Sequence, residues 1–357
     1  MGERRVNDAP TSRRHVRVGY VVRTLGAALW AFVRALVGRM RRGPRRPGWT
    51  WTEEVFAVVS RAVIHAAASD PWQASMVGRG PAPPIARHVR RAIGMGEVHL
   101  GGVRAERYVP RAARRGTILY AHGGGFVSGS VAWERRPAAE LAVLTGCETF
   151  SLDYRLAPRH PYPAALDDAV AAYRALLDRG CDPQTTVLVG GSAGACLSAS
   201  LLLRLRAEGL PLPAGALLLW PYTDFTFDLP SLAAHDDADV LSAADLRNVW
   251  GPAYLGSADP RDPFVSPSHA DLRGLPPLLV IAGGAEVMLS AAEHLADTAR
   301  TAGVDVQFTV YPHKVHAWMA LRRLPATIDA VDEIVAWFDL RLGAGVAGQA
   351  GAGTSSP

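Results

Sequence analysis

Ser192 is the residue whose surroundings in the sequence point most directly to chemistry. It lies in the pentapeptide 190–194, a G-x-S-x-G pattern, between the apolar run 186–190 and the amphipathic stretch 194–208. A serine held in a strained turn between a strand and a helix needs small neighbours, because larger side chains have no room there. The first amides of the helix also favour negative charge beside the serine. The pattern therefore predicts a nucleophilic serine; a glycine-rich turn without catalytic meaning is the alternative.

A run of glycines precedes the serine motif and offers donors for an anionic oxygen. The segment 122–126 reads His-Gly-Gly-Gly-Phe and directly follows the apolar run 117–121. Consecutive glycines let backbone N–H groups approach a substrate closely, and such donors stabilise the oxyanion that forms when a serine attacks an ester. We expect the amides of Gly124, Gly125 and Ala193 to form this oxyanion hole. A flexible glycine loop is the alternative, but the two motifs occur in the expected order.

A general base must follow the serine in the chain, and His316 is the best-placed histidine. It comes after the apolar run 306–311, in a loop at the carboxyl end of a late strand, where an imidazole can take the serine's proton. His313, three residues earlier, is the competing candidate. Four histidines upstream of the serine lack a matching context, and we interpret them as structural: His65, His88, His99 and His160.

The third member of such a site is an acid that orients the base. Glu286 is the nearest carboxylate after the apolar run 278–282. It would accept the proton on the far nitrogen of His316, fix its tautomer and stabilise the imidazolium. The order nucleophile, acid, base then matches that of serine hydrolases built on an α/β sheet. Asp297 and Asp305 are weaker candidates, and a surface glutamate that begins a helix is the structural alternative.

Short apolar runs alternate with amphipathic stretches along the chain, and these elements must position the side chains named above. The runs that predict strands are 117–121, 149–153, 186–190, 216–220, 278–282 and 306–311. The stretches that predict helices are 163–179, 194–208, 290–302 and 326–342. Near-continuous apolar strands are typical of a sheet buried on both faces. The pattern predicts an α/β fold, with a mostly parallel central sheet, helices on both faces and a helical cap.

Composition divides the chain into four parts. Residues 1–48 form a basic amphipathic extension, 49–96 are predicted to be N-terminal cap helices, and 97–342 form the catalytic domain. Within that domain, the segment from about 224 to 268 lacks a good strand and is rich in Asp, Pro and Ala. We interpret it as a cap insertion between two strands. The tail 343–357 is rich in Gly, Ala and Ser and is predicted to be disordered.

The N-terminal extension repeats apolar residues at helical spacing between Val18 and Met40. Arg23 and Arg34 interrupt this stretch and leave about ten uncharged residues, about half of what a membrane span needs. No small-residue cleavage site follows, so a secretory signal is not predicted. Three interpretations stay open: the helix packs over the active site as part of a cap, it lies on an acidic membrane surface, or it is a frayed basic extension.

Composition also limits the partners and cofactors of this 357-residue chain. The formal net charge is +5, but the basic residues beyond the N-terminal extension are spread out and form no nucleic-acid motif, so nucleic-acid binding is not predicted. Cys147, Cys181 and Cys196 are widely spaced and form no CxxC pair, which argues against a disulfide framework or a metal site. We expect a cytoplasmic protein, with peripheral membrane association as an open addition.

Four sequence blocks together resemble the hormone-sensitive-lipase-like family of bacterial esterases, which has the α/β-hydrolase fold. They are 122–126, the segment 153–158 (Asp-Tyr-Arg-Leu-Ala-Pro) with its continuation 161–164, the turn at Ser192, and Ser266-Pro267 leading to 275–277. The second block is the most specific to this family. The resemblance implies that the cap roofs an acyl pocket and that no metal or organic cofactor takes part.

Three positions depart from the usual pattern of that family. Gly191 stands where an aspartate usually precedes the serine, and Ala195 replaces a usual glycine. Glu286 stands where the acid is commonly aspartate. These departures bear on fine specificity rather than on the reaction.

Together these features predict a serine carboxylesterase that hydrolyses short- to medium-chain acyl esters through an acyl-enzyme. Its partner is a small-molecule ester. Two alternatives use the same apparatus: an acyltransferase, or a hydrolase of a lactone or acetyl ester in a specialised metabolite. A third alternative is a non-catalytic ligand-binding protein on the same fold. A homodimer formed through the edge strands of the sheet is also left open.

Overall fold

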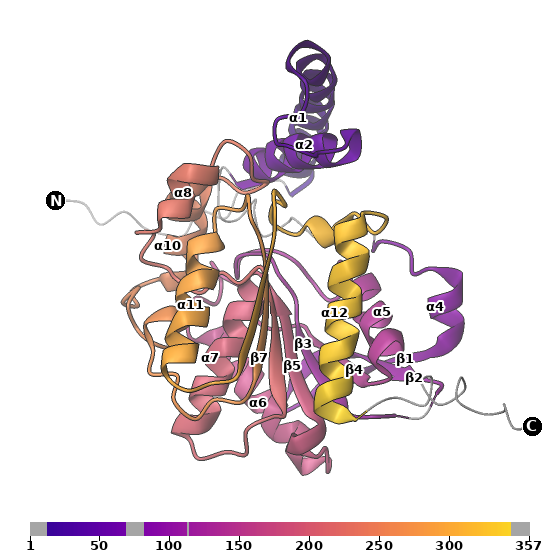
Figure 1. The fold of residues 1–357 in the computed structure, drawn as a ribbon, viewed down its shortest axis with the longest axis vertical. Helices are drawn as coiled ribbons and strands as arrows, with labels where there is room; N and C mark the ends of the chain where they lie inside the picture. Colours follow the sequence, from indigo (N-terminus) through magenta and orange to yellow (C-terminus); the bar gives the residue numbers. More distant parts are fainter. Residues whose placement is uncertain (1–12, 69–81, 113, 344–357) are drawn as a thin grey trace, which may run out of the picture.

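The computed structural model describes residues 13–68, 82–112 and 114–343, and its centre is one eight-stranded sheet (Figure 1). The strands are β1 (Ile93–Leu100), β2 (Val103–Pro110), β3 (Thr117–Ala121), β4 (Glu148–Leu152), β5 (Thr186–Gly191), β6 (Gly215–Leu219), β7 (Leu278–Gly283) and β8 (Val306–Tyr311). Their order in the sheet is β1-β2-β4-β3-β5-β6-β7-β8. β2 pairs antiparallel with both β1 and β4, whereas every other neighbouring pair is parallel.

Helices cover both faces of the sheet (Figure 1). The longer ones beside it are α5 (Arg135–Thr145), α6 (Ala164–Asp178), α7 (Ala193–Ala207), α11 (Leu289–Thr301) and α12 (Pro325–Leu342), and the short α4 (Arg87–Ala92) packs against α5 and β1. α6, α7 and α11 enclose one hydrophobic core with the sheet, while α5 and α12 enclose another on the opposite face. The mostly parallel α/β-hydrolase architecture predicted from the sequence is confirmed.

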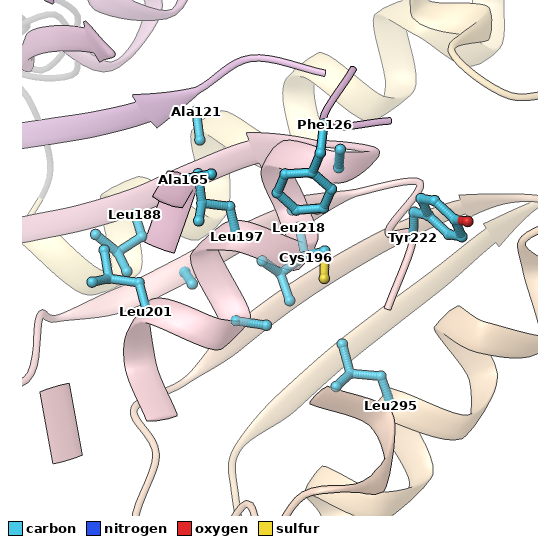
Figure 2. Close-up of a cluster of buried hydrophobic side chains, with 14 of the residues drawn as sticks. Ala121, Phe126, Ala165, Leu188, Cys196, Leu197, Leu201, Leu218, Tyr222 and Leu295 are labelled. Atoms are coloured by element: carbon cyan, nitrogen blue, oxygen red, sulfur yellow. The ribbon is translucent and has the colours of Figure 1, made fainter. Parts of the chain in front are cut away.

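The alternation of side chains along β5 explains why this strand reads as a continuous apolar run. Leu188 points into the core under α7, where Leu197 and Leu201 surround it (Figure 2). Val187 and Val189 point into the opposite core. Because both faces of the strand are covered, a polar side chain at any of these positions would be buried at a cost in folding free energy.

The six predicted strands are present as β3 to β8, and the four predicted helices are α6, α7, α11 and α12, each with ends within one residue of the prediction. β1 begins at Ile93, so the end of the segment 49–96, assigned to cap helices, belongs to the sheet instead. The predicted disordered tail 343–357 lies, apart from Gly343, outside the described residues.

Between β6 and β7 the chain leaves the sheet for a helical excursion. It contains α8 (Pro230–His235), α9 (Ala243–Asp245), a π-helical turn (Leu246–Trp250), α10 (Gly251–Leu255) and a 3₁₀ turn (Pro267–His269). Two further 3₁₀ turns lie outside it, at Pro183–Thr185 before β5 and at Trp318–Ala320 after β8. All of the insertion 224–268 is described, and it holds no strand. Tyr254 of α10 stacks on Phe126, which follows β3, with ring centroids 3.9 Å apart. The excursion therefore packs directly on the glycine-rich segment.

Two helices precede the sheet. α1 (Arg13–Arg42) packs against α2 (Trp51–Ala68) through the small side chains of Ala31 and Ala35, which cluster with Val58. In Figure 1, α1 extends away from the sheet beyond α2. No helix in the described part of the chain combines the length and apolar character that a membrane span requires.

Candidate active site

Ser192 occupies a sharp turn between β5 and α7. Its backbone has φ +56° and ψ −119°, in the region that L residues other than glycine rarely adopt. The N–H of Ser192 donates to the carbonyl of Leu219 at the end of the neighbouring β6, 2.9 Å away. This contact ties the turn to the carboxyl edge of the sheet, where the strain presents the serine side chain above the strand ends.

The small residues around Ser192 are required by close backbone approach. A Cβ atom on Gly190 would lie 2.1 Å from the carbonyl carbon of Gly194, and one on Gly194 would lie 2.0 Å from the carbonyl oxygen of Ala121. Neither distance is tolerable for a side chain. At Gly191 a Cβ would come within 3.1 Å of the indole nitrogen of Trp220. This crowding gives a steric reason for a glycine at the position before the serine.

The glycine-rich segment lies beside the serine turn. A Cβ on Gly123 would come within 3.5 Å of the Ser192 Cβ atom. Gly124 and Gly125 have φ values of +122° and +61°, which only glycine adopts at little cost. Within the described residues, no hydrogen bond takes up the amide N–H of Gly124, Gly125 or Ala193. Three donors near the serine are thus left available.

His122 and Tyr154 hold that segment in place. Their rings stack with centroids 4.3 Å apart, and the Tyr154 hydroxyl donates to the His122 carbonyl at 2.6 Å. The His122 Nδ1 lies 2.7 Å from the carbonyl oxygen of Gly123. Burial lowers the pKa of His122, because the charged imidazolium loses its hydration there. His122 therefore supports the loop as a neutral ring.

Glu286 and His316 meet in the interior at the ends of two adjacent strands. The Glu286 Oε2 atom lies 2.7 Å from His316 Nδ1, and the two side chains are 0% and 6% exposed. Glu286 follows β7, and its other oxygen accepts from the N–H of Gly283 at the end of that strand. No hydrogen bond in the described part of the chain engages His316 Nε2. The carboxylate thus orients the imidazole through Nδ1, and Nε2 has no hydrogen-bond partner among the described residues.

The competing candidates lie in other surroundings. Asp297 forms an exposed ion pair with Arg300, and Asp305 pairs with Arg341. His313 contributes its carbonyl oxygen to a contact with the N-terminal segment. The structure thus brings Glu286, and neither Asp297 nor Asp305, to His316.

Comparisons with known proteins agree with this fold. A family model described as the alpha/beta hydrolase fold matches residues 118–320, more than half of the chain. An acetyl-hydrolase of Streptomyces hygroscopicus is 40% identical over 222 residues, which cover 62% of this chain and 74% of that protein. An esterase of Acinetobacter venetianus is 37% identical over 215 residues, covering 60% and 71%.

A solved structure extends the likeness to nearly the whole chain. The crystal structure of an esterase from the bacterial hormone-sensitive lipase family has a TM-score of 0.70 at 31% identity, covering 91% of this chain and 99% of that one. The chain belongs to the hormone-sensitive lipase family. The predicted family is confirmed, and with it the prediction of a carboxylic-ester hydrolase.

Two residues that contact His316 in this member of the hormone-sensitive lipase family are not predicted from the sequence. Trp220 follows β6, and its ring lies edge-on to His316 with centroids 6.3 Å apart. Its place at the end of a predicted strand was an available signal. Asp239 is fully buried and accepts hydrogen bonds from the N–H groups of His316 and Val287. It sits in the polar run His-Asp-Asp-Ala-Asp (235–239), which reads as a solvated loop and carries no signal of burial.

One further group of side chains has the composition of a metal site. Asp224, His269 and His294 offer ligand atoms within 4.8 Å of one another, and the Asp224 Oδ2 already lies 2.9 Å from His269 Nε2. Two imidazoles and a carboxylate suit Zn²⁺. The group shares no residue with the candidate active site. A hollow of about 690 Å³ between α1 and α2 is likewise lined by none of the predicted site residues.

Proposed function

We propose that this protein is a serine carboxylesterase that hydrolyses short- to medium-chain acyl esters through an acyl-enzyme. Ser192 is the nucleophile, His316 the base and Glu286 the acid. The observation that carries the proposal is the buried 2.7 Å contact between Glu286 and His316. It lies at the same edge of the sheet as the strained turn that presents Ser192. A nucleophile, a base and an acid that orients the base form the set that serine hydrolases commonly use for this chemistry.

The reaction then runs in two steps. His316 Nε2 takes the hydroxyl proton as Ser192 Oγ attacks the ester carbonyl, and Glu286 stabilises the imidazolium that forms. The N–H groups of Gly124, Gly125 and Ala193 receive the negative oxygen; such donors contribute about 3 kcal/mol each in comparable sites. His316 returns the proton to the departing alcohol. In the second step His316 takes a proton from water, which attacks the acyl-enzyme carbonyl; His316 then gives that proton to Ser192 Oγ as the carboxylic acid leaves.

The preference for short and medium acyl groups rests on the crowding near the oxyanion donors. A Cβ on Gly125 would lie 2.3 Å from the Trp250 ring, so the tryptophan closes that side of the site. Tyr222 and Phe225 pack together with centroids 4.3 Å apart, and the N–H of Tyr222 donates to the Ser192 carbonyl. Bulky, buried rings beside the nucleophile leave little length for an acyl chain. The relative named an acetyl-hydrolase is consistent with a small acyl group.

Hydrolysis of the 4-nitrophenyl esters of acetate, butyrate, octanoate and palmitate tests the proposal. The wild type should be most active on butyrate or octanoate, and Ser192→Ala or His316→Ala should lower kcat by about 10⁴-fold or more. Asp297→Ala is the matched control, because this exposed carboxylate was the competing acid; it should keep wild-type activity.

The alternatives give different outcomes in the same assay. A folded wild type without activity on any of these esters, but with Ser192 labelled by an organophosphonate, would point to acyl transfer or to a lactone or acetyl ester of a specialised metabolite. Absence of labelling would support a non-catalytic binding protein.

We also propose that α1 brings the enzyme to an acidic membrane surface. Large apolar side chains of this helix are exposed: Val22, Leu25, Leu29, Trp30, Phe32, Val33 and Met40. The helix contains no acidic residue. Its Arg34 and Arg41 are exposed, whereas Arg39 and Arg42 pair with Glu54 of α2. Apolar side chains among arginines match the interface of an anionic bilayer, where the former insert and the latter pair with lipid headgroups.

A further inference from the structure

The geometry points to Asp239 as a positioning residue that sets the placement of His316 relative to Glu286; this inference rests on the proposed function and deepens it. The Asp239 Oδ1 atom accepts from the N–H of His316, and Oδ2 accepts from the N–H of Val287, each at 2.8 Å. Val287 directly follows Glu286 in the chain. One carboxylate therefore joins the loop of the base to the loop of the acid.

The two loops reach Asp239 from different strands. The acid loop follows β7 and the histidine loop follows β8, while Asp239 belongs to the insertion after β6. A carboxylate is rigid and planar, so two hydrogen bonds of normal length to its two oxygens fix both backbones against each other. Without it, the 2.7 Å contact between Glu286 and His316 would depend on two loops that move separately.

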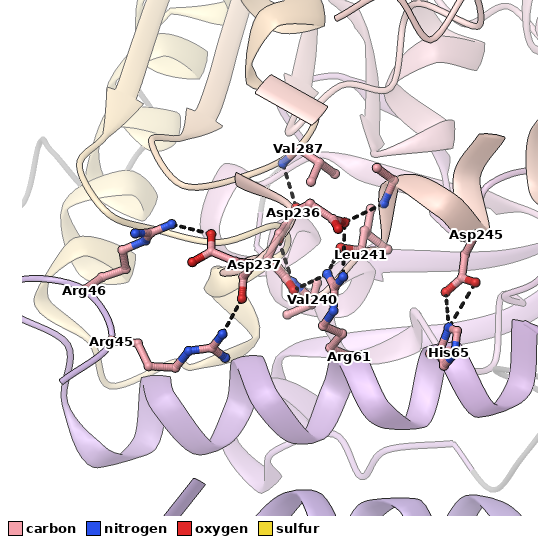
Figure 3. A network of polar contacts seen from close by, with 12 residues as sticks. Arg45, Arg46, Arg61, His65, Asp236, Asp237, Val240, Leu241, Asp245 and Val287 are labelled. Atoms are coloured by element: carbon pink, nitrogen blue, oxygen red, sulfur yellow. Dashed lines mark hydrogen bonds and ion pairs between the residues drawn. The ribbon is translucent and has the colours of Figure 1, made fainter. Parts of the chain in front are cut away.

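The segment that contains Asp239 is fastened to α2, as Figure 3 shows for the contacts of Arg61 with Asp236 and of His65 with Asp245. The Arg61 guanidinium of α2 donates to the carbonyl of Asp239 at 3.1 Å and pairs with Asp236 at 3.1 Å. His65, one turn further along α2, contacts Asp245 at 2.9 Å. The stretch 236–245 is thus fastened to α2 on both sides of Asp239, which keeps the carboxylate facing the two loops.

Charged groups face Asp239 from both loops and from α2. His316 and the Glu286 carboxylate face it from the two loops, and Arg61 contacts its backbone from α2. Burial raises the pKa of Asp239 to about 6, with the Glu286 charge adding to the rise and His316 and the two amides opposing it. Protonation would remove the negative charge and turn one oxygen into a weaker acceptor, so the bridge should weaken below about pH 6.

Asp239→Asn is the direct test, with Asp239→Ala as the larger change and Asp237→Asn as the matched control. Asparagine keeps the shape but can accept through only one atom. Asp237 lies two residues earlier, is exposed and pairs with Arg46. For 4-nitrophenyl butyrate, with active sites counted by organophosphonate titration, Asp239→Asn should lower kcat about 10- to 100-fold at nearly constant KM, because small misplacement of a base has effects of this size. Asp237→Asn should match the wild type.

Two readouts separate a positioning role from a merely structural one. The decline of wild-type kcat as pH falls past about 6 should be reduced in Asp239→Asn, because the titrating group is gone. Hydrogen exchange should accelerate in the acid and histidine loops, 283–289 and 312–318, in Asp239→Ala and not in Asp237→Asn. Wild-type kcat, pH profile and exchange in the Asp239 variants would overturn the inference. An inactive wild type whose loops still loosen in Asp239→Ala would overturn the proposed esterase and leave the bridge standing.

Discussion

Because the contact between Glu286 and His316 is short, the length of the acidic side chain at position 286 should affect activity. Aspartate at this position keeps the charge but is one methylene shorter, about 1.5 Å. We therefore expect Glu286→Asp to lower kcat about 100-fold on 4-nitrophenyl butyrate, since an orienting group misplaced by about 1 Å has effects of this order. Glu286→Gln keeps the length of the side chain and loses its charge. Its kcat should fall further than that of Glu286→Asp, because the wrong tautomer of His316 is favoured. Full activity of Glu286→Gln would move the acid elsewhere.

Asp239 should also make the stability of the fold depend on pH. Its pKa rises from 3.8 to about 6, chiefly because burial disfavours the charge. Between these values the folded protein keeps a proton that the unfolded chain releases, so this group stabilises the fold most at low pH and less as pH rises towards 6. The difference is about 3 kcal/mol. Between about pH 4 and about pH 7, urea unfolding should show the unfolding free energy of the wild type falling by most of this amount relative to that of Asp239→Asn. A constant difference between the two proteins would contradict it.

At the scale of residues, what the sequence can predict depends on how local the cause is. The glycines around Ser192 are dictated by contacts within one turn and its neighbouring strand, so their spacing alone identifies the turn. The burial of Asp239 arises from the meeting of the insertion, two loops and α2. Nothing in the run 235–239 carries that information, because the same letters describe a solvated loop.

At the scale of elements, the segment before α2 holds the histidine loop. The Trp49 indole N–H donates to the carbonyl of His313 at 2.6 Å, and Lys314 donates to Glu53. Although burial acts to raise it, hydrogen bonds from Lys314 and Thr50 hold the pKa of Glu53 below its ordinary value. The start of α2 is thus fastened to the loop that carries the proposed base.

Trp49→Phe should measure that attachment. Phenylalanine keeps an aromatic ring in the core, but it removes the donor and part of the buried ring. The unfolding free energy should therefore fall by about 1–3 kcal/mol. Urea unfolding gives this value, and kcat should fall with it because the histidine loop loosens. Trp51→Phe is the control, since Trp51 is exposed and its ring lies under the Arg39 guanidinium. Equal effects at the two positions would argue against the attachment.

The elements that the sequence predicts differ in their burial from those that it does not predict. β3 to β8 are read as apolar runs because most are covered on both faces. β1 is a partly exposed edge strand with Gly94 and Gly96, so its pattern is weak. α5 opens with Arg135, Arg136 and Pro137, which resemble a polar loop in the absence of tertiary contacts. Burial on one side only leaves a fainter trace in the sequence than burial on both.

At the scale of the whole molecule, α1 shows a limit of the same kind. Its apolar spacing predicts an amphipathic helix, but three placements satisfied that pattern. In the structure the small side chains Ala31 and Ala35 face α2, while larger apolar side chains such as Leu25 and Leu29 face outward. Periodicity locates an apolar face; tertiary packing decides which part of it is covered.

Sedimentation with vesicles decides what covers that outward face. The protein should bind phosphatidylcholine vesicles that contain phosphatidylserine more tightly than phosphatidylcholine alone, and binding should weaken from about 0.01 to 0.15 M salt as the Debye length shortens from about 30 to 8 Å. Leu25→Asp with Leu29→Asp should abolish binding, whereas Ile328→Asp, at an exposed apolar position of α12, should not. Equal vesicle binding by both variants would exclude α1 as the contact. If the protein is a dimer in the absence of vesicles and only the α1 variant is monomeric, the face binds a second copy of the chain. An apolar face buried between two copies needs no charged lipid.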